Sequence, residues 1–209
     1  MPPSRRPRST RVLVLVASLA AAVAALGIVL LGVSSGGGGG DAYNASAINP
    51  SRPAPATTGT AYDGTPVDAP TPGRPAVVTF LFANCPDVCP TIAAVLATSL
   101  DDLGADADEL DVIAVSVDPE GDTPEAVGGF LDRFNLDGRM QYITGTRAEL
   151  TPLWKEWFVL AQEEGADAST HSARVVLIDR DGRQVASYAA GVPVPVADMT
   201  EDLRTLIAS

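Results

Sequence analysis

Cysteine and histidine are almost absent from this sequence, which has two cysteines and one histidine in 209 residues. Both cysteines, Cys85 and Cys89, lie in the stretch "FANCPDVCP", and each is followed by a proline. A disulfide between them would close a loop of only a few residues. Because a structural disulfide stabilises a fold mainly by closing a loop in the unfolded chain, this one would add little. We infer that the two thiols serve chemistry rather than stability.

Basic residues are scarce beyond the first eleven positions. Four of the 14 lie between Arg5 and Arg11, and no acidic residue precedes Asp41. The remainder carries 10 basic residues against 26 acidic ones, a formal charge of −16. A body this anionic repels phosphate backbones, so the composition excludes nucleic acid as the expected partner.

Charged residues are missing altogether from residues 12–33, a run of 22 residues that is long enough to cross a bilayer, which needs about 20. The arginines before it predict a cytoplasmic basic segment at 1–11, a single transmembrane anchor at 12–33 and an extracytoplasmic C-terminal domain at the cell membrane. A cleaved signal peptide is the alternative, although the run is long for one and the nearest small-residue site, "ASA" at 45–47, is distant. No cysteine lies near the run, which excludes a lipoprotein anchor.

Large apolar residues are rare between residues 34 and 74, where Gly, Pro, Ala and Thr dominate. Such a segment cannot bury enough surface to offset the entropy of ordering it. We therefore predict a flexible Gly/Pro-rich tether at 34–74, followed by a domain at 75–209, whose length suits one domain.

Strand and helix patterns alternate in this domain. The runs "AVVTFLFA" and "DVIAVSVD" are typical of buried parallel strands. Thr123 before Pro124, and a capping box from Thr146 to Glu149, indicate helix starts. Asp181-Gly182 between apolar runs predicts a hairpin. The order β-α-β-α-β-α-β-β-α predicts an α/β fold in which helices flank a central mixed sheet.

The helix after Thr146 is expected to bury an apolar stripe that reaches Phe158 and Ala161, and the last helix is expected at 196–207.

The two cysteines fall between the first buried strand and its helix, at the sheet edge where ligand sites gather in α/β folds. The positive end of a helix dipole favours thiolate, the reactive and metal-binding form. Residues four apart in a helix are separated by about 6 Å along its axis, near the upper limit for a disulfide. This spacing favours chelation of one soft cation over rapid redox cycling, but both uses stay open.

His171, in "THSARVVLID", is the single candidate for a third soft or borderline donor. A lone histidine at such a place is commonly just a surface or core residue, but the pairing with the only two cysteines favours a shared site. Two thiolates and an imidazole suit Cu(I), and Cu(II) if another ligand joins, whereas zinc usually takes four ligands.

Three stretches resemble, in order and spacing, the signatures of the SCO/SenC family: "FANCPDVCP" at 82–90, "VSVDPEGDTPEAV" at 115–127 and "THSARVVLIDRDG" at 170–182. Members of that family are membrane-anchored, thioredoxin-like copper proteins that help assemble the dinuclear copper site of cytochrome c oxidase. The resemblance implies a thioredoxin-like copper-binding domain at 75–209, with the ligands Cys85, Cys89 and His171. Two positions depart from the family pattern: Thr170, where an acidic residue is usual, and Gly121, where a basic one is.

Two functions follow. A copper metallochaperone would bind Cu(I) or Cu(II) and pass it to the copper-bearing subunit of cytochrome c oxidase, with another periplasmic-type copper chaperone or a thiol reductant as further partners. A thiol:disulfide reductase would use Cys85 and Cys89 as a redox pair on the acceptor's cysteines. Only the first is a non-enzymatic role, and only the first needs His171. A peroxiredoxin-like peroxidase is disfavoured because no activating Arg and Thr surround Cys85.

Overall fold

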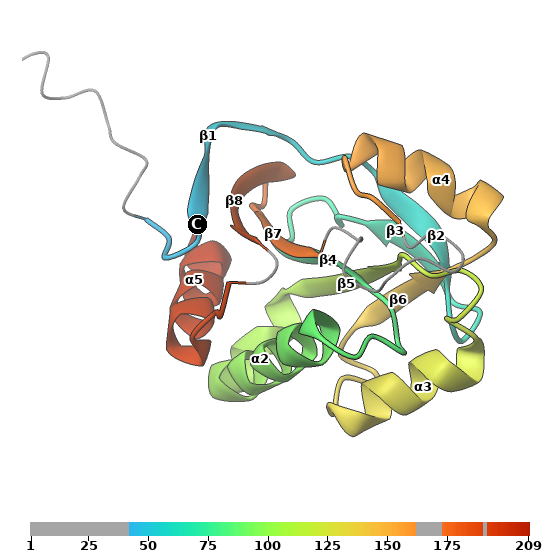
Figure 1. Cartoon of the computed structure of the whole chain (residues 1–209). Coiled ribbons are helices and arrows are strands. Elements are labelled where there is room, and N and C mark those ends of the chain that lie inside the picture. Colours follow the sequence, from blue (N-terminus) through green and yellow to red (C-terminus); the bar gives the residue numbers. More distant parts are fainter. Residues whose placement is uncertain (1–41, 162–172, 190–191) are drawn as a thin grey trace, which may run out of the picture. The chain divides into compact units, whose positions relative to one another are not determined.

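The computed structural model describes residues 42–161, 173–189 and 192–209 (Figure 1). The predicted basic segment at 1–11, the predicted anchor at 12–33 and His171 lie outside the described residues.

A central sheet of eight strands, in the order β1-β8-β7-β4-β5-β6-β2-β3, organises the domain. Strands β4, β5 and β6 are parallel to one another, and the other pairs are antiparallel. The predicted mixed sheet is therefore confirmed. The strands are β1 Ser46–Pro53, β2 Thr57–Ala61, β3 Pro66–Ala69, β4 Ala76–Leu81, β5 Asp111–Ser116, β6 Gln141–Thr144, β7 Arg174–Ile178 and β8 Arg183–Ala189.

Helices cover both faces of the sheet. Figure 1 shows α2, α3 and α5 on one side and α4 on the other. Helices α2 and α5 also pack against each other. From β4 onward the strands and α-helices follow the predicted order. The helices are α2 Val88–Leu103, the 3₁₀ helix η1 Gly104–Glu109, α3 Pro124–Arg133, α4 Arg147–Glu156 and α5 Val196–Ala208.

The local signals in the sequence form as expected. Thr123 accepts a hydrogen bond from the backbone N–H of Ala126 at 3.2 Å, with Pro124 as the first residue of α3. Thr146 and Glu149 form both halves of a capping box at the start of α4. Gly182 has a φ of 71° in the turn between β7 and β8, a conformation that favours glycine.

The predicted tether is wrong for residues 46–69, which form three strands of the sheet. β1 pairs with β8 and β2 pairs with β6, so backbone hydrogen bonds to strands with large apolar side chains hold these segments in place. Their own buried residues are mostly small, which is why composition suggested disorder. Gly59 allows the close approach: a Cβ there would lie 2.6 Å from Cγ2 of Ile143.

The predicted stripe of α4 is also wrong at its end, because the helix stops at Glu156. Trp157 is buried, but Phe158 has a φ of 53° and its side chain is 76% exposed. The N–H of Val159 donates to the carbonyl of Trp154, and that of Phe158 to Lys155. These two bonds define a Schellman motif with Phe158 at the left-handed position that glycine usually occupies.

Candidate copper site

Cys85 and Cys89 lie where β4 gives way to α2, as predicted. The backbone N–H of Cys85 donates to the carbonyl of Phe82 at 3.2 Å, which turns the chain after the strand. Cys89 is the second residue of α2. The two cysteines are not joined in a disulfide and both are buried, with 5% and 0% of their surface exposed. The loop therefore holds two reduced thiols in a sheltered place.

The two thiols interact with each other. A hydrogen bond to Cys85 raises the pKa of the Cys89 thiol, burial raises it further, and a hydrogen bond from the Phe82 backbone only partly opposes them. The expectation that the helix N-terminus favours thiolate thus fails for Cys89, because its burial and its neighbouring thiol outweigh the dipole. A cation that binds Cys89 has to displace a proton.

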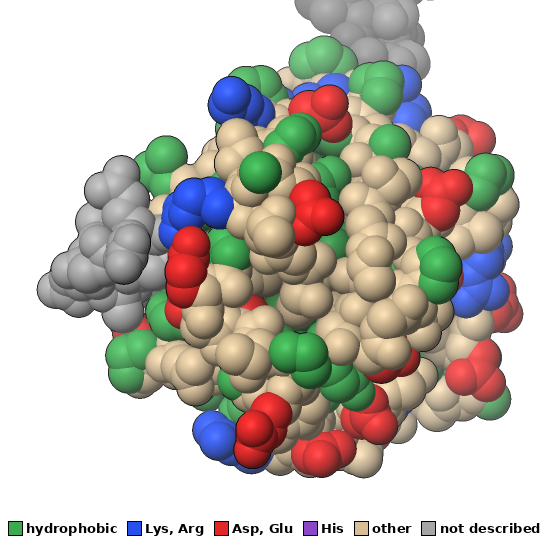
Figure 2. All heavy atoms as spheres, turned by 90° about the vertical axis from the view of Figure 1, so that its right-hand side faces the viewer, with side chains coloured by type: hydrophobic (Ala, Val, Ile, Leu, Met, Phe, Trp, Pro, Cys, Tyr) green, Lys and Arg blue, Asp and Glu red, His purple; other side chains and the backbone are tan. Residues whose placement is uncertain are grey.

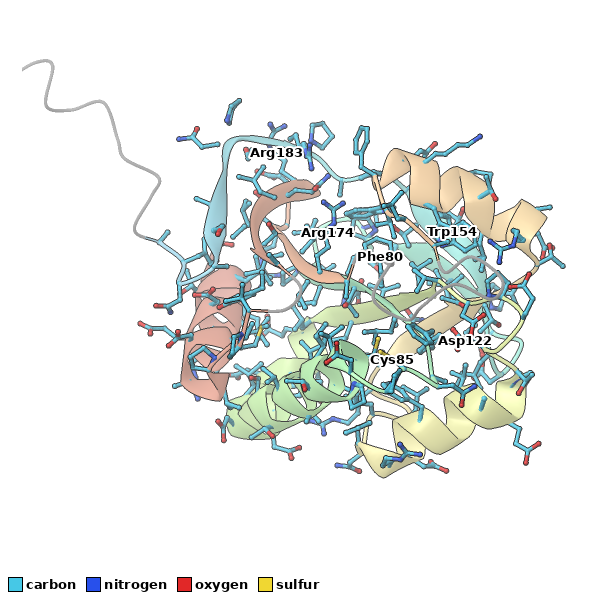
Figure 3. All side chains as sticks on the ribbon, in the orientation of Figure 1. Phe80, Cys85, Asp122, Trp154, Arg174 and Arg183 are labelled. Atoms are coloured by element: carbon cyan, nitrogen blue, oxygen red, sulfur yellow. The ribbon has the colours of Figure 1, made fainter. Side chains whose placement is uncertain are left out.

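A buried carboxylate supports this loop from the segment between β5 and α3. Asp122 is only 4% exposed and accepts three hydrogen bonds. They come from the N–H of Ala83 at 2.7 Å, the hydroxyl of Ser116 at 2.6 Å and the hydroxyl of Tyr142 at 2.9 Å. Burial raises the pKa of Asp122 to about 6, although these hydrogen bonds oppose the shift. Asp122 therefore ties the dithiol loop to β5 and β6 (Figure 3).

A second contact joins the same two loops through Gly121. Its carbonyl accepts a hydrogen bond from the side chain of Asn84 at 3.2 Å. A Cβ at Gly121 would lie 2.1 Å from Oδ2 of Asp118, so any other residue requires the Asp118 side chain to move. This explains in steric terms why glycine stands where the resemblance leads us to expect a basic residue.

Three residues of the site were not predicted from the sequence: Asp122, Ser116 and Tyr142. Asp122 lies in the quoted "VSVDPEGDTPEAV" stretch, but only the fold shows that its carboxylate faces the dithiol loop. An acidic residue directly before the Thr-Pro of a helix start was the available signal.

His171 falls outside the described residues, so its role stays a prediction. β7 begins at Arg174, and Val175 pairs with Thr79 of antiparallel β4. The strand that follows His171 thus starts at the sheet edge where β4 ends and the dithiol loop begins. Within the described ranges, no group of three Cys, His, Asp or Glu residues could hold a metal ion.

A cavity of about 360 Å³ opens beside the dithiol loop. Its wall includes Asp87 and Val88 of the loop and the start of α2, and apolar side chains of β7 and of the segment before α5. A partner's side chains could therefore enter beside the start of α2, although neither thiol lines this cavity.

The described residues include one helix long and apolar enough to cross a membrane, Val88–Glu109. It consists of α2 and η1, and α2 buries Leu96, Leu100 and Leu103 inside the domain. It is thus a core helix, distinct from the predicted anchor.

Known proteins resemble this chain over most of the domain. The profile of the SCO1/SenC family matches residues 58–208. The SCO1 protein homolog of Bacillus subtilis is 26% identical over 130 residues, which is 60% of this chain and 67% of that protein. The structure of Bradyrhizobium japonicum ScoI with copper bound is 30% identical, with a TM-score of 0.59 over 74% of this chain and 98% of that one. A SCO1/SenC family lipoprotein from Bacillus anthracis is 26% identical, with a TM-score of 0.62 over 72% of this chain and 92% of that one.

Proposed function

Because the chain belongs to the SCO1/SenC family, we propose that it is a copper-binding metallochaperone for assembly of the copper site of cytochrome c oxidase. The observation that carries the proposal is the pair of buried thiols, not joined in a disulfide, in a loop held by a hydrogen bond to Asp122. The similarity to a Sco structure with copper bound supports copper as the cargo.

Cys85 and Cys89 supply two thiolates in this proposal, and His171 supplies the third donor. Three such donors suit Cu(I), and one further oxygen or nitrogen ligand would allow Cu(II). Because Asp122 fixes the backbone at Ala83, the loop needs little reordering when copper binds, which preserves affinity. The proton held by Cys89 leaves as copper enters.

The location and partners complete the proposal. A single-pass anchor at 12–33 would hold the domain on the extracytoplasmic side of the cell membrane. There it would receive copper from a periplasmic-type chaperone and deliver it to the copper-bearing oxidase subunit. The apolar cavity beside the dithiol loop offers room for the partner's ligands during exchange.

A thiol:disulfide reductase is the second candidate, and the hydrogen bond between the two thiols favours it because it brings the sulfurs close. Cys85, the more exposed thiol, would attack a disulfide of the acceptor as thiolate and form a mixed disulfide. Cys89 would then lose its proton and displace the acceptor's second thiol. The acceptor gains two electrons and two protons, and the pair becomes a disulfide.

Substitution of His171 separates the two functions. His171→Ala should weaken copper binding strongly and change the Cu(II) absorption spectrum, while the cysteines still oxidise and are reduced as in the parent. Cys85→Ser and Cys89→Ser should abolish both properties. Asp132→Asn, which alters an exposed side chain of α3, is the control for unspecific effects of a substitution. If His171→Ala binds copper like the parent and supports normal oxidase assembly, the ligand assignment fails and the reductase becomes the better reading.

A further inference from the structure

Arg174 lies at the sheet edge near the dithiol loop, with a guanidinium that is only partly satisfied. One of its terminal nitrogens donates to the carbonyl of Trp157, at the C-terminus of α4. Its Nε is buried and has no hydrogen-bond partner among the described residues. The guanidinium lies 5.9 Å from the centre of the Phe80 ring, on the α4 side of the sheet (Figure 3). The contact with α4 accounts for one donor and leaves the buried Nε without a role.

A second arginine lies close to the first. Burial lowers the pKa of Arg174, and the positive charge of Arg52 lowers it further. Arg52 is exposed, and its Nε donates to the side-chain oxygen of Gln184 at 3.3 Å. Within the described ranges, neither arginine belongs to an ion pair, whereas Arg74, Arg139, Arg147 and Arg180 each do. Arg174 contacts the carbonyl of Trp157 and Arg52 lies over the ring of the next residue, Phe158, so the two arginines belong to one cluster that holds no described carboxylate.

Carboxylates are abundant in this molecule, which makes the arrangement unusual. On the face shown in Figure 2, acidic side chains are spread out and basic ones lie between them. The chain beyond residue 11 has 26 acidic residues against 10 basic ones, so carboxylates are abundant. Like charges repel, and a pair that is kept together without a counter-ion is a favourable place for an external anion.

An exposed aromatic ring borders the same two arginines. The guanidinium of Arg52 lies 6.0 Å from the centre of the Phe158 ring. Phe158 is 76% exposed and occupies the left-handed position of the Schellman motif, where a bulky residue is strained and glycine is not. Leu160, two residues further, is 66% exposed. A strained, exposed aromatic beside arginines has the composition of a protein interface, where aromatic residues and Arg are enriched.

We propose that Arg52, Phe158 and Arg174 form a docking surface for carboxylate side chains of an acidic protein that exchanges copper with the dithiol. This proposal rests on the proposed function for the identity of the partner, because a copper-exchanging protein must approach the end of β4 where Arg174 and the dithiol loop lie. Arg174 is aligned with Phe80 near the end of β4, and Cys85 follows four residues after that strand. The remaining surface is anionic and repels an acidic partner. The docking surface therefore attracts that partner to the domain.

Peptide binding to the full chain in non-ionic detergent tests the proposal. The probe is an acetylated peptide of four glutamates with a fluorescent label, followed by anisotropy, and a peptide of four glutamines is its neutral control. At low salt the glutamate peptide should bind saturably, and about 0.5 M salt should abolish binding because charges are screened. Arg52→Gln and Arg174→Gln should each weaken binding about tenfold. Arg133→Gln, which removes the same charge from an exposed position of α3, should change the affinity for the peptide less than about twofold.

Phe158→Gly provides a readout that a purely structural role would not give. Glycine relieves the left-handed strain, so the melting temperature should rise while peptide binding weakens. Should Arg174→Gln fail to fold, Arg52→Gln carries the test, because Arg52 is exposed.

Several outcomes would overturn the docking surface: no saturable binding at low salt, equal binding of the glutamine peptide, or an equal loss in Arg133→Gln. Tighter binding of glycerol 3-phosphate than of the glutamate peptide, lost in the same two variants, would assign the arginines to lipid headgroups instead. Copper binding measured on the same preparations keeps the two proposals apart. Peptide binding without copper binding sinks the proposed function alone, and copper binding without peptide binding sinks the docking surface alone.

Discussion

Asp122 accepts the backbone N–H of Ala83 at 2.7 Å, which couples a carboxylate after β5 to the loop that presents Cys85. Ser116 and Tyr142 direct their hydroxyls to the other oxygen of the same carboxylate. The position of the thiols therefore depends on a polar cluster beneath them as well as on the loop itself.

Removal of this carboxylate should destabilise the fold. Asp122→Ala leaves three donors, two of them on buried side chains, without their acceptor, so the free energy of unfolding should fall by about 2 to 4 kcal/mol. Urea unfolding measures the change. Asp132→Asn is the control and should stay within about 0.5 kcal/mol of the parent. A loss below 1 kcal/mol in Asp122→Ala would mean that water replaces the carboxylate readily.

The free energy of unfolding should depend on pH because Asp122 titrates at a different pH in the folded and unfolded states. Its pKa of about 6 in the folded state lies above the ordinary value of 3.8, so the folded state prefers the protonated acid. This preference stabilises the folded state fully below pH 4, and the stabilisation is lost as the pH rises through about 6. The free energy of unfolding should fall by about 3 kcal/mol over this range. Asp122→Asn cannot titrate. The difference in unfolding free energy between parent and variant should thus change between pH 4 and 6 and level off above 7. A difference that is flat over this range would contradict the raised pKa.

Substitution of Gly121 should strain the loop contact. In Gly121→Ala the new Cβ meets Oδ2 of Asp118, so the carboxylate must rotate and its hydrogen bond with the Gly121 N–H is disturbed. We expect a loss of about 1 to 2 kcal/mol in chemical unfolding. Adding Asp118→Ala should relieve the clash, so that the double variant costs less than the sum of the two single changes. Strict additivity would show that the contact is unimportant.

Gly59→Ala tests whether the segment assigned to a tether by composition belongs to the domain. Its Cβ would overlap Cγ2 of Ile143 in the neighbouring strand, so stability should fall by about 1 to 3 kcal/mol. Gly129→Ala is the matched control: it lies in α3 with no atom within 4 Å of its Cβ, and alanine should stabilise the helix by about 0.5 to 1 kcal/mol. If Gly59→Ala left the free energy of unfolding unchanged, residues 57–61 would belong to the tether rather than to the sheet.

Copper affinity should increase with pH. Because Cys89 is protonated in the free protein, each proton displaced on binding makes the apparent affinity rise about tenfold per pH unit. Competition with a Cu(I) chelator at pH 6, 7 and 8, together with the number of protons released into a weak buffer, measures this. An affinity that does not vary with pH would mean that the thiols are already ionised.

The sequence was most informative where a few neighbouring residues decide the structure. Thr123 with Pro124, the Thr146 capping box and Asp181-Gly182 act locally, and each formed as predicted. Phe158 was misplaced because apolar spacing continues past the point where the helix ends. β1 to β3 were missed because their stability comes from pairing with distant strands. Asp122 was missed for the same reason: its three partners are brought together only by the fold. The assignment of His171 as a ligand stays a prediction.

The position of β1 limits how far the domain can travel. With the proposed anchor ending at Val33 and β1 starting at Ser46, only residues 34–45 join them. Fully extended, these 12 residues span about 40 Å, less than a third of the reach of a tether that ran to residue 74. If the proposed anchor and function hold, a copper-loaded domain on so short a linker would meet only acceptors whose metal sites lie near the same bilayer surface. Delivery then becomes a lateral encounter between membrane neighbours, and its rate should depend on the density of both proteins in the membrane rather than on their concentration in the surrounding volume.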